Sequence, residues 1–140
     1  EHEEYTARMF ELYAKLSYAQ RISEDDSLTF PVMPSSHEKK YFSYAGKLFA
    51  KVHQANGRFG LAVDCFRNYV SAGMYDEAAD MINSGTLVSN NSQFQRLYQL
   101  CIPTAETMRD PTATFRKDFQ RKKCAKLIEA IKSCAISVGK

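Results

Sequence analysis

The chain has 140 residues, of which 44% are apolar and 12% aromatic, so it is long enough to bury a core of its own and too aromatic for a disordered segment. Its net charge is only +3, but residues 112–140 hold eight Lys and Arg against two Asp and Glu, which indicates an acidic partner: nucleic acid, an anionic membrane or an acidic protein surface. No run approaches the ~20 apolar residues of a membrane-spanning helix, and the four cysteines include no C-x-x-C pair and are too sparse for a disulfide framework.

This cysteine usage predicts a reduced, intracellular protein of the cytoplasm or nucleus. Only six glycines and four prolines occur, leaving long uninterrupted windows, so we expect an all-α fold of about six helices, arranged as antiparallel hairpins in a short stack or a helical bundle. The sequence does not begin with methionine, and we expect residues 1–140 to form one helical domain cut from a longer protein.

Between residues 3 and 20, apolar residues recur every three or four positions, which predicts an amphipathic helix. They are Tyr5, Met9, Leu12, Leu16 and Ala19. A loop with two prolines and an acidic triplet follows over residues 21–36, and we expect Phe30, Val32 and Met33 to anchor it on the core.

Ser35 or Ser36 supplies an N-cap for a second helix, which Asn56 and Gly57 end because both residue types tolerate left-handed backbone. One side of this helix is apolar and the far side is basic. The apolar stripe comprises Tyr41, Ala45, Leu48, Phe49 and Val52, and the far side carries Lys47 and Lys51.

The third and fourth helices, expected at residues 59–71 and from 75 to about 83, begin with the same phrase. Glycine, an aromatic residue, alanine and a large apolar residue stand at one spacing in Gly57, Phe59, Ala62 and Phe66, and sixteen residues later in Gly73, Tyr75, Ala78 and Ile82. Each glycine predicts a chain reversal and each alanine a close helix contact. Apolar residues cover roughly 200° of the third helix, so we expect neighbours on two of its sides.

These two phrases resemble the second half of a tetratricopeptide-type repeat, and the resemblance spans about residues 41–83. It implies a tetratricopeptide-like or other α-solenoid stack, in which paired helices form grooves that hold peptides. The function that it implies is that of a protein-interaction scaffold.

A short fifth helix is expected around Phe94, Leu97, Tyr98 and Cys101, stopped by Pro103 and followed by a linker. Asp110 and Pro111 then begin a basic last helix over about residues 112–137, within the basic segment 112–140. One face of that helix is apolar and holds Cys124, Leu127, Ile131, Cys134, Ala135 and Val138.

Phe115 and Phe119 project from nearly the opposite face, beside Lys122 and Lys126. We favour a bend near residues 120–122 that returns both rings to the core, the commonest place for phenylalanine. The alternative is a partner surface in which the two rings are flanked by Arg116, Lys122, Lys123 and Lys126. A second candidate surface is the groove around Tyr44, Lys47 and Lys51.

The sequence gives little indication of catalysis or of a metal or phosphate site. His53 and Cys65 are the one pair placed to act as base and nucleophile, but both fall on or beside apolar stripes, so we expect no catalysis. The histidines and cysteines lack zinc-ligand spacing, the acidic triplet at residues 24–26 lacks the pattern of a calcium loop, and no glycine-rich phosphate loop occurs. We therefore expect no metal, no cofactor and no small-molecule substrate.

The leading hypothesis is a non-catalytic helical module that binds another protein or peptide. The alternative is RNA or other nucleic-acid binding through the basic last helix, which predicts an affinity that falls steeply with salt. Attachment of that helix to a membrane surface is a third possibility and the weakest, because its apolar face is rich in small residues and lacks Trp.

Overall fold

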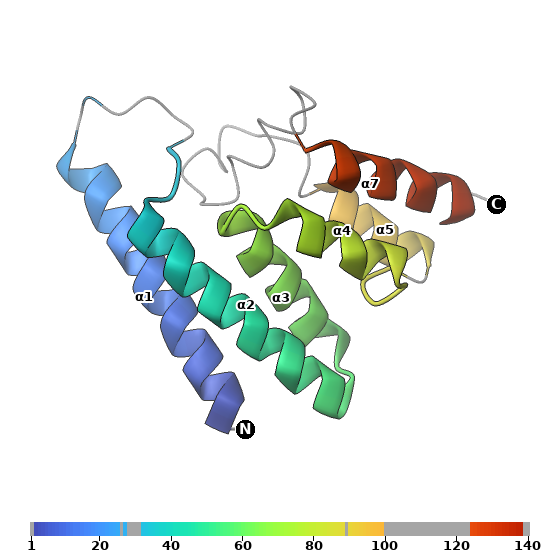
Figure 1. Cartoon of the computed structure of the whole chain (residues 1–140), viewed down its shortest axis with the longest axis horizontal. Helices are drawn as coiled ribbons and strands as arrows, with labels where there is room; N and C mark the ends of the chain where they lie inside the picture. Colours follow the sequence, from blue (N-terminus) through green and yellow to red (C-terminus); the bar gives the residue numbers. More distant parts are fainter. Residues whose placement is uncertain (1, 26, 28–31, 89, 100–123, 139–140) are drawn as a thin grey trace.

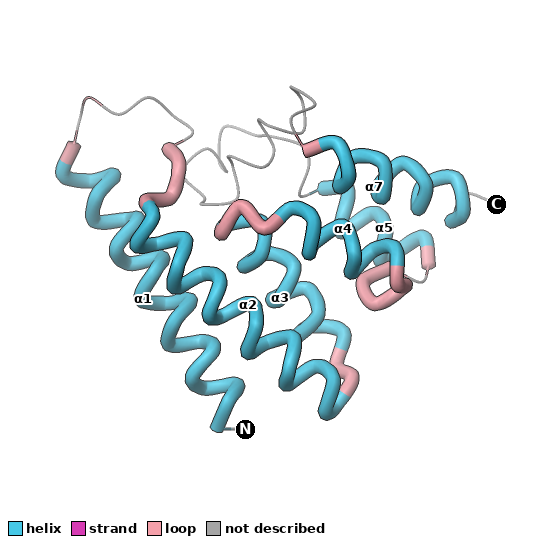
Figure 2. The backbone as a smooth tube through the Cα atoms, viewed as in Figure 1, coloured by secondary structure: helices cyan, strands magenta, loops and turns pink. Residues whose placement is uncertain are grey.

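The computed structural model describes residues 2–25, 27, 32–88, 90–99 and 124–138, and within them it contains six helices and no strand (Figures 1 and 2). The all-α prediction is confirmed for this part of the chain. The helices are α1 (His2–Glu24), α2 (Ser36–Asn56), α3 (Phe59–Ser71), α4 (Tyr75–Asn83), α5 (Asn91–Gln99) and α7 (Ala125–Val138).

The two predicted chain reversals are present, and they stack α2, α3 and α4 as neighbours. Gly57 and Gly73 have φ angles of 71° and 76°, the left-handed conformation that glycine adopts without strain. The alanines that follow them, Ala62 and Ala78, are both 0% exposed. The repeated phrase therefore produces the same local structure twice: a tight turn followed by a helix packed closely at its alanine.

α3 lies between two groups of helices (Figure 1). On one side, Leu61 and Cys65 pack with residues of α1 and α2. On the other, Ala62 and Phe66 belong to a cluster that includes buried residues of α4, α5 and α7. The wide apolar arc predicted for α3 is thus covered on two sides, as expected.

α2 packs so closely on α3 that there is no room for a side chain at Gly46 of α2. A Cβ added there would lie 2.6 Å from Cδ1 of Tyr69. α2 begins at a capping box, in which the Ser35 hydroxyl accepts from the Glu38 backbone N–H and the Glu38 carboxylate accepts from the Ser35 N–H.

Glu38 is 1% exposed, and its carboxylate accepts hydrogen bonds from Arg21 (2.7 Å) and the Ser17 hydroxyl (2.9 Å), which fasten α1 to the start of α2. Burial alone would raise the pKa of Glu38, but the bonds from Arg21, Ser35 and Ser17 outweigh it and hold the pKa below its ordinary value. In the loop between these helices, Val32 is buried and its carbonyl accepts from the Tyr18 hydroxyl at 2.7 Å.

Met33 is 53% exposed, so the prediction that it anchors on the core is wrong, and Phe30 lies outside the described residues. Val32 and the Arg21 bond to the Met33 carbonyl fix this stretch through its backbone instead, leaving the Met33 side chain in solvent.

α1 turns toward the body the side opposite to its predicted apolar stripe. Its buried residues are Ala7, Ala14, Tyr18 and Ile22. The predicted apolar stripe exists, but it faces solvent, whereas an amphipathic helix ordinarily buries such a face. On the buried side, Ala7 and Ala14 let α1 approach α2 closely, and Tyr18 and Ile22 supply large side chains to the core.

α7 lies across α4 and contacts α5 (Figure 1). Of its predicted apolar face, Cys124, Leu127 and Ile131 are buried, while Cys134 and Ala135 are half-buried. Ile128 and Ala130 are buried as well, so the packed face is wider than the spacing indicated. The predicted linker, Phe115, Phe119 and the expected bend at residues 120–122 lie outside the described residues.

Candidate interaction surface

The site residues predicted for the last helix are mostly beyond the described ranges. Phe115, Arg116, Phe119, Lys122 and Lys123 fall there. Lys126 is described: it is half-exposed, and its Nζ lies 2.9 Å from the Asp80 carboxylate, so it ties α7 to α4. The hydrogen bond to Asp80 raises the pKa of Lys126 above its ordinary value. Exposed ion pairs of this kind stabilise a protein little.

The second predicted surface, around Tyr44, Lys47 and Lys51, lies on the outer side of α2. Tyr44 is 38% exposed and Lys47 and Lys51 are exposed. Lys51 pairs with Glu3 of α1 at 2.8 Å. Lys40 belongs to the same side, with its Nζ 5.9 Å from the centre of the Tyr44 ring. These residues share one exposed side of α2, and their role in binding a partner stays a prediction.

An aromatic cluster that the sequence did not reveal lies along the contact between α1 and α2. Its centroid distances run from 4.7 Å for Tyr13 and Tyr41 to 5.7 Å for Tyr41 and Tyr44. The Tyr13 hydroxyl and His37 Nε2 are 3.1 Å apart. The cluster comprises Phe10, Tyr13, His37, Tyr41 and Tyr44.

Next to the aromatic cluster runs the exposed side of α1. We call it the α1 stripe and define it as Tyr5, Met9, Leu12 and Leu16, which are 73%, 64%, 50% and 61% exposed. Tyr13, 50% exposed, joins the stripe to the aromatic cluster. Scattered exposed apolar residues are ordinary, whereas these four form a contiguous row on one helix, and the largest apolar patch of a monomer is often functional.

Basic side chains border the α1 stripe on the side toward α3. Arg8 and Lys15 are 46% and 45% exposed, whereas their acidic neighbours Glu4 and Glu11 are only 22% and 16% exposed. Arg8 lies 3.2 Å from Glu4 and 3.3 Å from Asp64. Burial raises the pKa of Asp64 above its ordinary value, and Arg8 only partly offsets the effect. The cations thus stay at the surface while the carboxylates turn toward the body.

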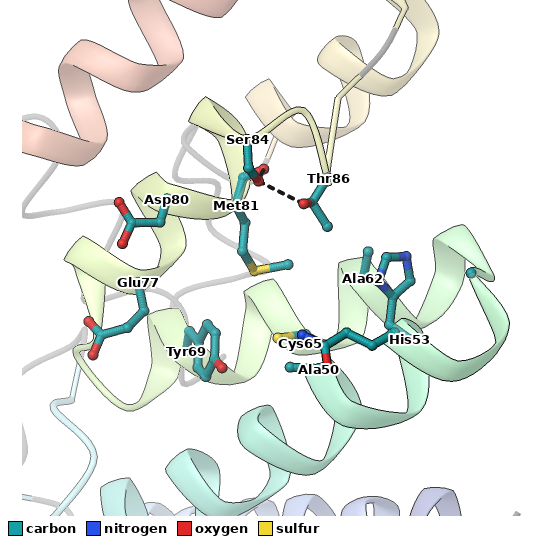
Figure 3. A pocket seen from close by; sticks show the side chains of 12 residues that line it. Ala50, His53, Ala62, Cys65, Tyr69, Glu77, Asp80, Met81, Ser84 and Thr86 are labelled. Carbon is teal, nitrogen blue, oxygen red and sulfur yellow. Dashed lines mark hydrogen bonds between the residues drawn. The ribbon is translucent and has the colours of Figure 1, made fainter.

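A separate cavity of about 640 Å³ opens between α2, α3 and α4 (Figure 3). His53 of α2 and Cys65 of α3 line it with Met81, and the carboxylates of Glu77 and Asp80 lie at its α4 side. Cys65 is 1% exposed, and burial raises the pKa of its thiol to about 12. At neutral pH the thiol is therefore protonated, the form that is a poor nucleophile.

Within the described ranges, no three His, Cys, Asp or Glu side chains gather closely enough to hold a metal ion. None of the helices described combines the length and the apolar character needed to cross a membrane. Comparison with family models, with curated proteins and with solved structures gives no match for this chain.

Proposed function

We propose that this chain is a helical interaction module that binds another protein and performs no catalysis itself. The observation that carries the proposal is the α1 stripe, whose four large apolar side chains each expose half or more of their surface. With side chains of roughly 150–200 Å², such a row exposes on the order of 400 Å², which is already the size of the largest apolar patch on a typical monomer.

The packing of α1 supports the same proposal. A helix with apolar residues on two opposite sides is typical of an inner layer, where a neighbour covers each side. The body covers only the side with Ala7 and Ala14, so one layer is left for a partner to supply. Burial of apolar surface is the main driving force of most protein association, and this surface is available without rearranging the core.

We further propose that the stack is a solenoid of the tetratricopeptide type. Its support is the repeated turn: Gly57 and Gly73 adopt positive φ, and Ala62 and Ala78 are fully buried at matching positions. The free thiols of Cys65 and Cys134 support a reducing, intracellular setting. Cys65 and His53 line the cavity between α2, α3 and α4, and the protonated state of the Cys65 thiol supports the proposal that this cavity is not catalytic.

Site-directed photo-cross-linking tests the proposed function. A photoreactive phenylalanine replaces Met9 in the α1 stripe, and a matched chain carries it at Lys132, an exposed position on α7. We expect protein adducts at position 9 that resist ribonuclease, exceed those at position 132 and disappear in a Leu12→Gln, Leu16→Gln background. Adducts no stronger than those at position 132, or adducts that ribonuclease removes, would overturn the proposal.

A further inference from the structure

We infer that the partner of the α1 stripe is an amphipathic helix whose apolar seam is bordered by acidic side chains. The inference rests on the proposed function and adds the chemistry of the partner. It uses three features of the described surface: the spacing of the stripe, the charges on both sides of it, and the aromatic cluster beside it.

The spacing of the stripe matches the seam between two packed helices. Tyr5, Met9, Leu12 and Leu16 follow one another at intervals of four, three and four residues, the alternation found at the two core positions of a heptad. The seam covers about 17 Å of α1. A straight partner helix with the same alternation would contact all four side chains along its length.

Both margins of the stripe are basic. Toward α3 stand Arg8 and Lys15, whose positions flank the seam where coiled coils carry the charges that select a partner. Toward α2, beyond the aromatic cluster, stand Lys40 and Lys47, neither of which has an acidic partner in the part of the chain that the structure describes. Carboxylates on both flanks of an incoming helix would complement these charges.

The acidic residues of this surface offset the charges of Arg8 and Lys15 but leave those of Lys40 and Lys47. The single acidic residue of α2 is Glu38, which is buried against Arg21. Glu4 pairs with both Arg8 and Arg58, and Glu11 pairs with Lys15. A partner therefore meets apolar and aromatic side chains with the half-exposed Arg8 and Lys15 on one margin, whose carboxylate partners are less exposed. On the other margin it meets the exposed Lys40 and Lys47.

A second copy of this chain is a poorer occupant. In an antiparallel pair of α1 helices, Arg8 and Lys15 would face the same cations of the other copy, which like-charge repulsion disfavours. A bilayer is poorer too, because membrane-surface helices bury a broad apolar face, whereas this seam is narrow and Glu3 and Glu24 stand at the two ends of α1.

The test uses a synthetic amphipathic helix of about 20 residues, a length at which an isolated helix begins to be stable. Leu and Met occupy its seam and Glu both flanks, and a twin peptide carries Lys in place of every Glu. Binding to the whole chain is measured by fluorescence anisotropy. The variants are Lys40→Glu with Lys47→Glu, and a control with the same change in net charge at exposed positions of α7, Lys132→Glu with Ser133→Glu and Ser137→Glu.

We expect the acidic helix to bind at least about tenfold more tightly than its twin, and the Lys40→Glu, Lys47→Glu chain to lose about tenfold while the α7 control changes less than about twofold. No binding of the acidic helix, equal binding of the twin, or equal loss in the α7 control would overturn the inference. So would tighter binding to anionic phosphatidylserine vesicles, or a dimer that buries Met9. Any of these results together with specific protein adducts at position 9 would leave the proposed function standing.

Discussion

The outward orientation of α1 makes a quantitative prediction about two positions on the same helix. Leu16 is 61% exposed, whereas Ala14 is 0% exposed. Periodicity favours the opposite assignment, because Leu16 belongs to the apolar stripe and Ala14 does not. Leu16→Gln and Ala14→Leu therefore separate the two orientations, and all the residue types involved are good helix formers, so helix propensity changes little.

The magnitudes follow from these exposures. Full burial of a leucine is worth about 1.5–3 kcal/mol, and Leu16 has lost well under half of its accessible surface, so Leu16→Gln should cost less than about 1 kcal/mol. Ala14→Leu inserts three carbons into a close-packed contact, and overpacking of this kind costs about 1–3 kcal/mol.

Urea unfolding followed by circular dichroism measures the change in the free energy of unfolding for both variants. The slope of that free energy against urea concentration, m, checks that each variant unfolds in a comparable transition. Two protein concentrations are compared, because self-association would add a term to the free energy of unfolding. A cost of about 2 kcal/mol or more for Leu16→Gln, with no cost for Ala14→Leu, would show that the stripe is core and would refute the orientation of α1.

Three further predictions concern the rest of the body. Gly46→Ala should lower the free energy of unfolding by about 1 kcal/mol despite alanine's better helix propensity, because the added Cβ would meet Tyr69. Gly60→Ala is the control: a Cβ there meets nothing within 4 Å, so this variant should be neutral or stabilising in the same urea assay. The pKa of Glu38 is held below its ordinary value of 4.5, so its contribution to stability is complete above about pH 4.5 and is lost as pH falls through the lower pKa of the folded state. Glu38→Gln should therefore cost about 2–3 kcal/mol at neutral pH. It should also reduce the loss of stability at acid pH in a plot of the free energy of unfolding against pH. Cys65, with its pKa raised to about 12, should react with iodoacetamide at neutral pH at least about tenfold more slowly than the half-buried Cys134, as measured by mass spectrometry of the labelled peptides.

Each of these predictions has a clear contrary result. Equal effects of alanine at positions 46 and 60 would show that α2 and α3 are not in close contact there. An unchanged loss of stability at acid pH in Glu38→Gln would mean that the carboxylate is solvated in the folded chain. Rapid alkylation of Cys65 in the native chain would reopen a catalytic role for the cavity.

The elements that the sequence predicted well are those with local signals. Ser35 starts α2 and Gly57 ends it because capping and left-handed backbone need only a few neighbouring residues. The breadth of the apolar arc on α3 predicted its two neighbours for a similar reason: a helix apolar over more than half its surface has to be covered on more than one side.

The orientation of α1 could not be predicted in this way. Periodicity identifies the faces of a helix but not the neighbours that cover them, and here the body covers the side with Ala7, Ala14, Tyr18 and Ile22 instead of the predicted stripe. The aromatic cluster was not predicted for a related reason: its members come from two helices and meet only after these helices pack. The signal for the buried Glu38 was present in the spacing Ser-x-x-Glu, typical of a capping box.

The location of the partner helix is the central claim, and paramagnetic relaxation tests it most directly. A nitroxide is placed at the centre of the acidic helix, and the methyl signals of the methionines are followed by NMR during titration. Met9 lies in the α1 stripe and Met81 lines the cavity between α2, α3 and α4, so the two methyl groups report on different apolar surfaces. Selective broadening of Met9 is the predicted result, and selective broadening of Met81 would place the partner in the cavity and contradict the account.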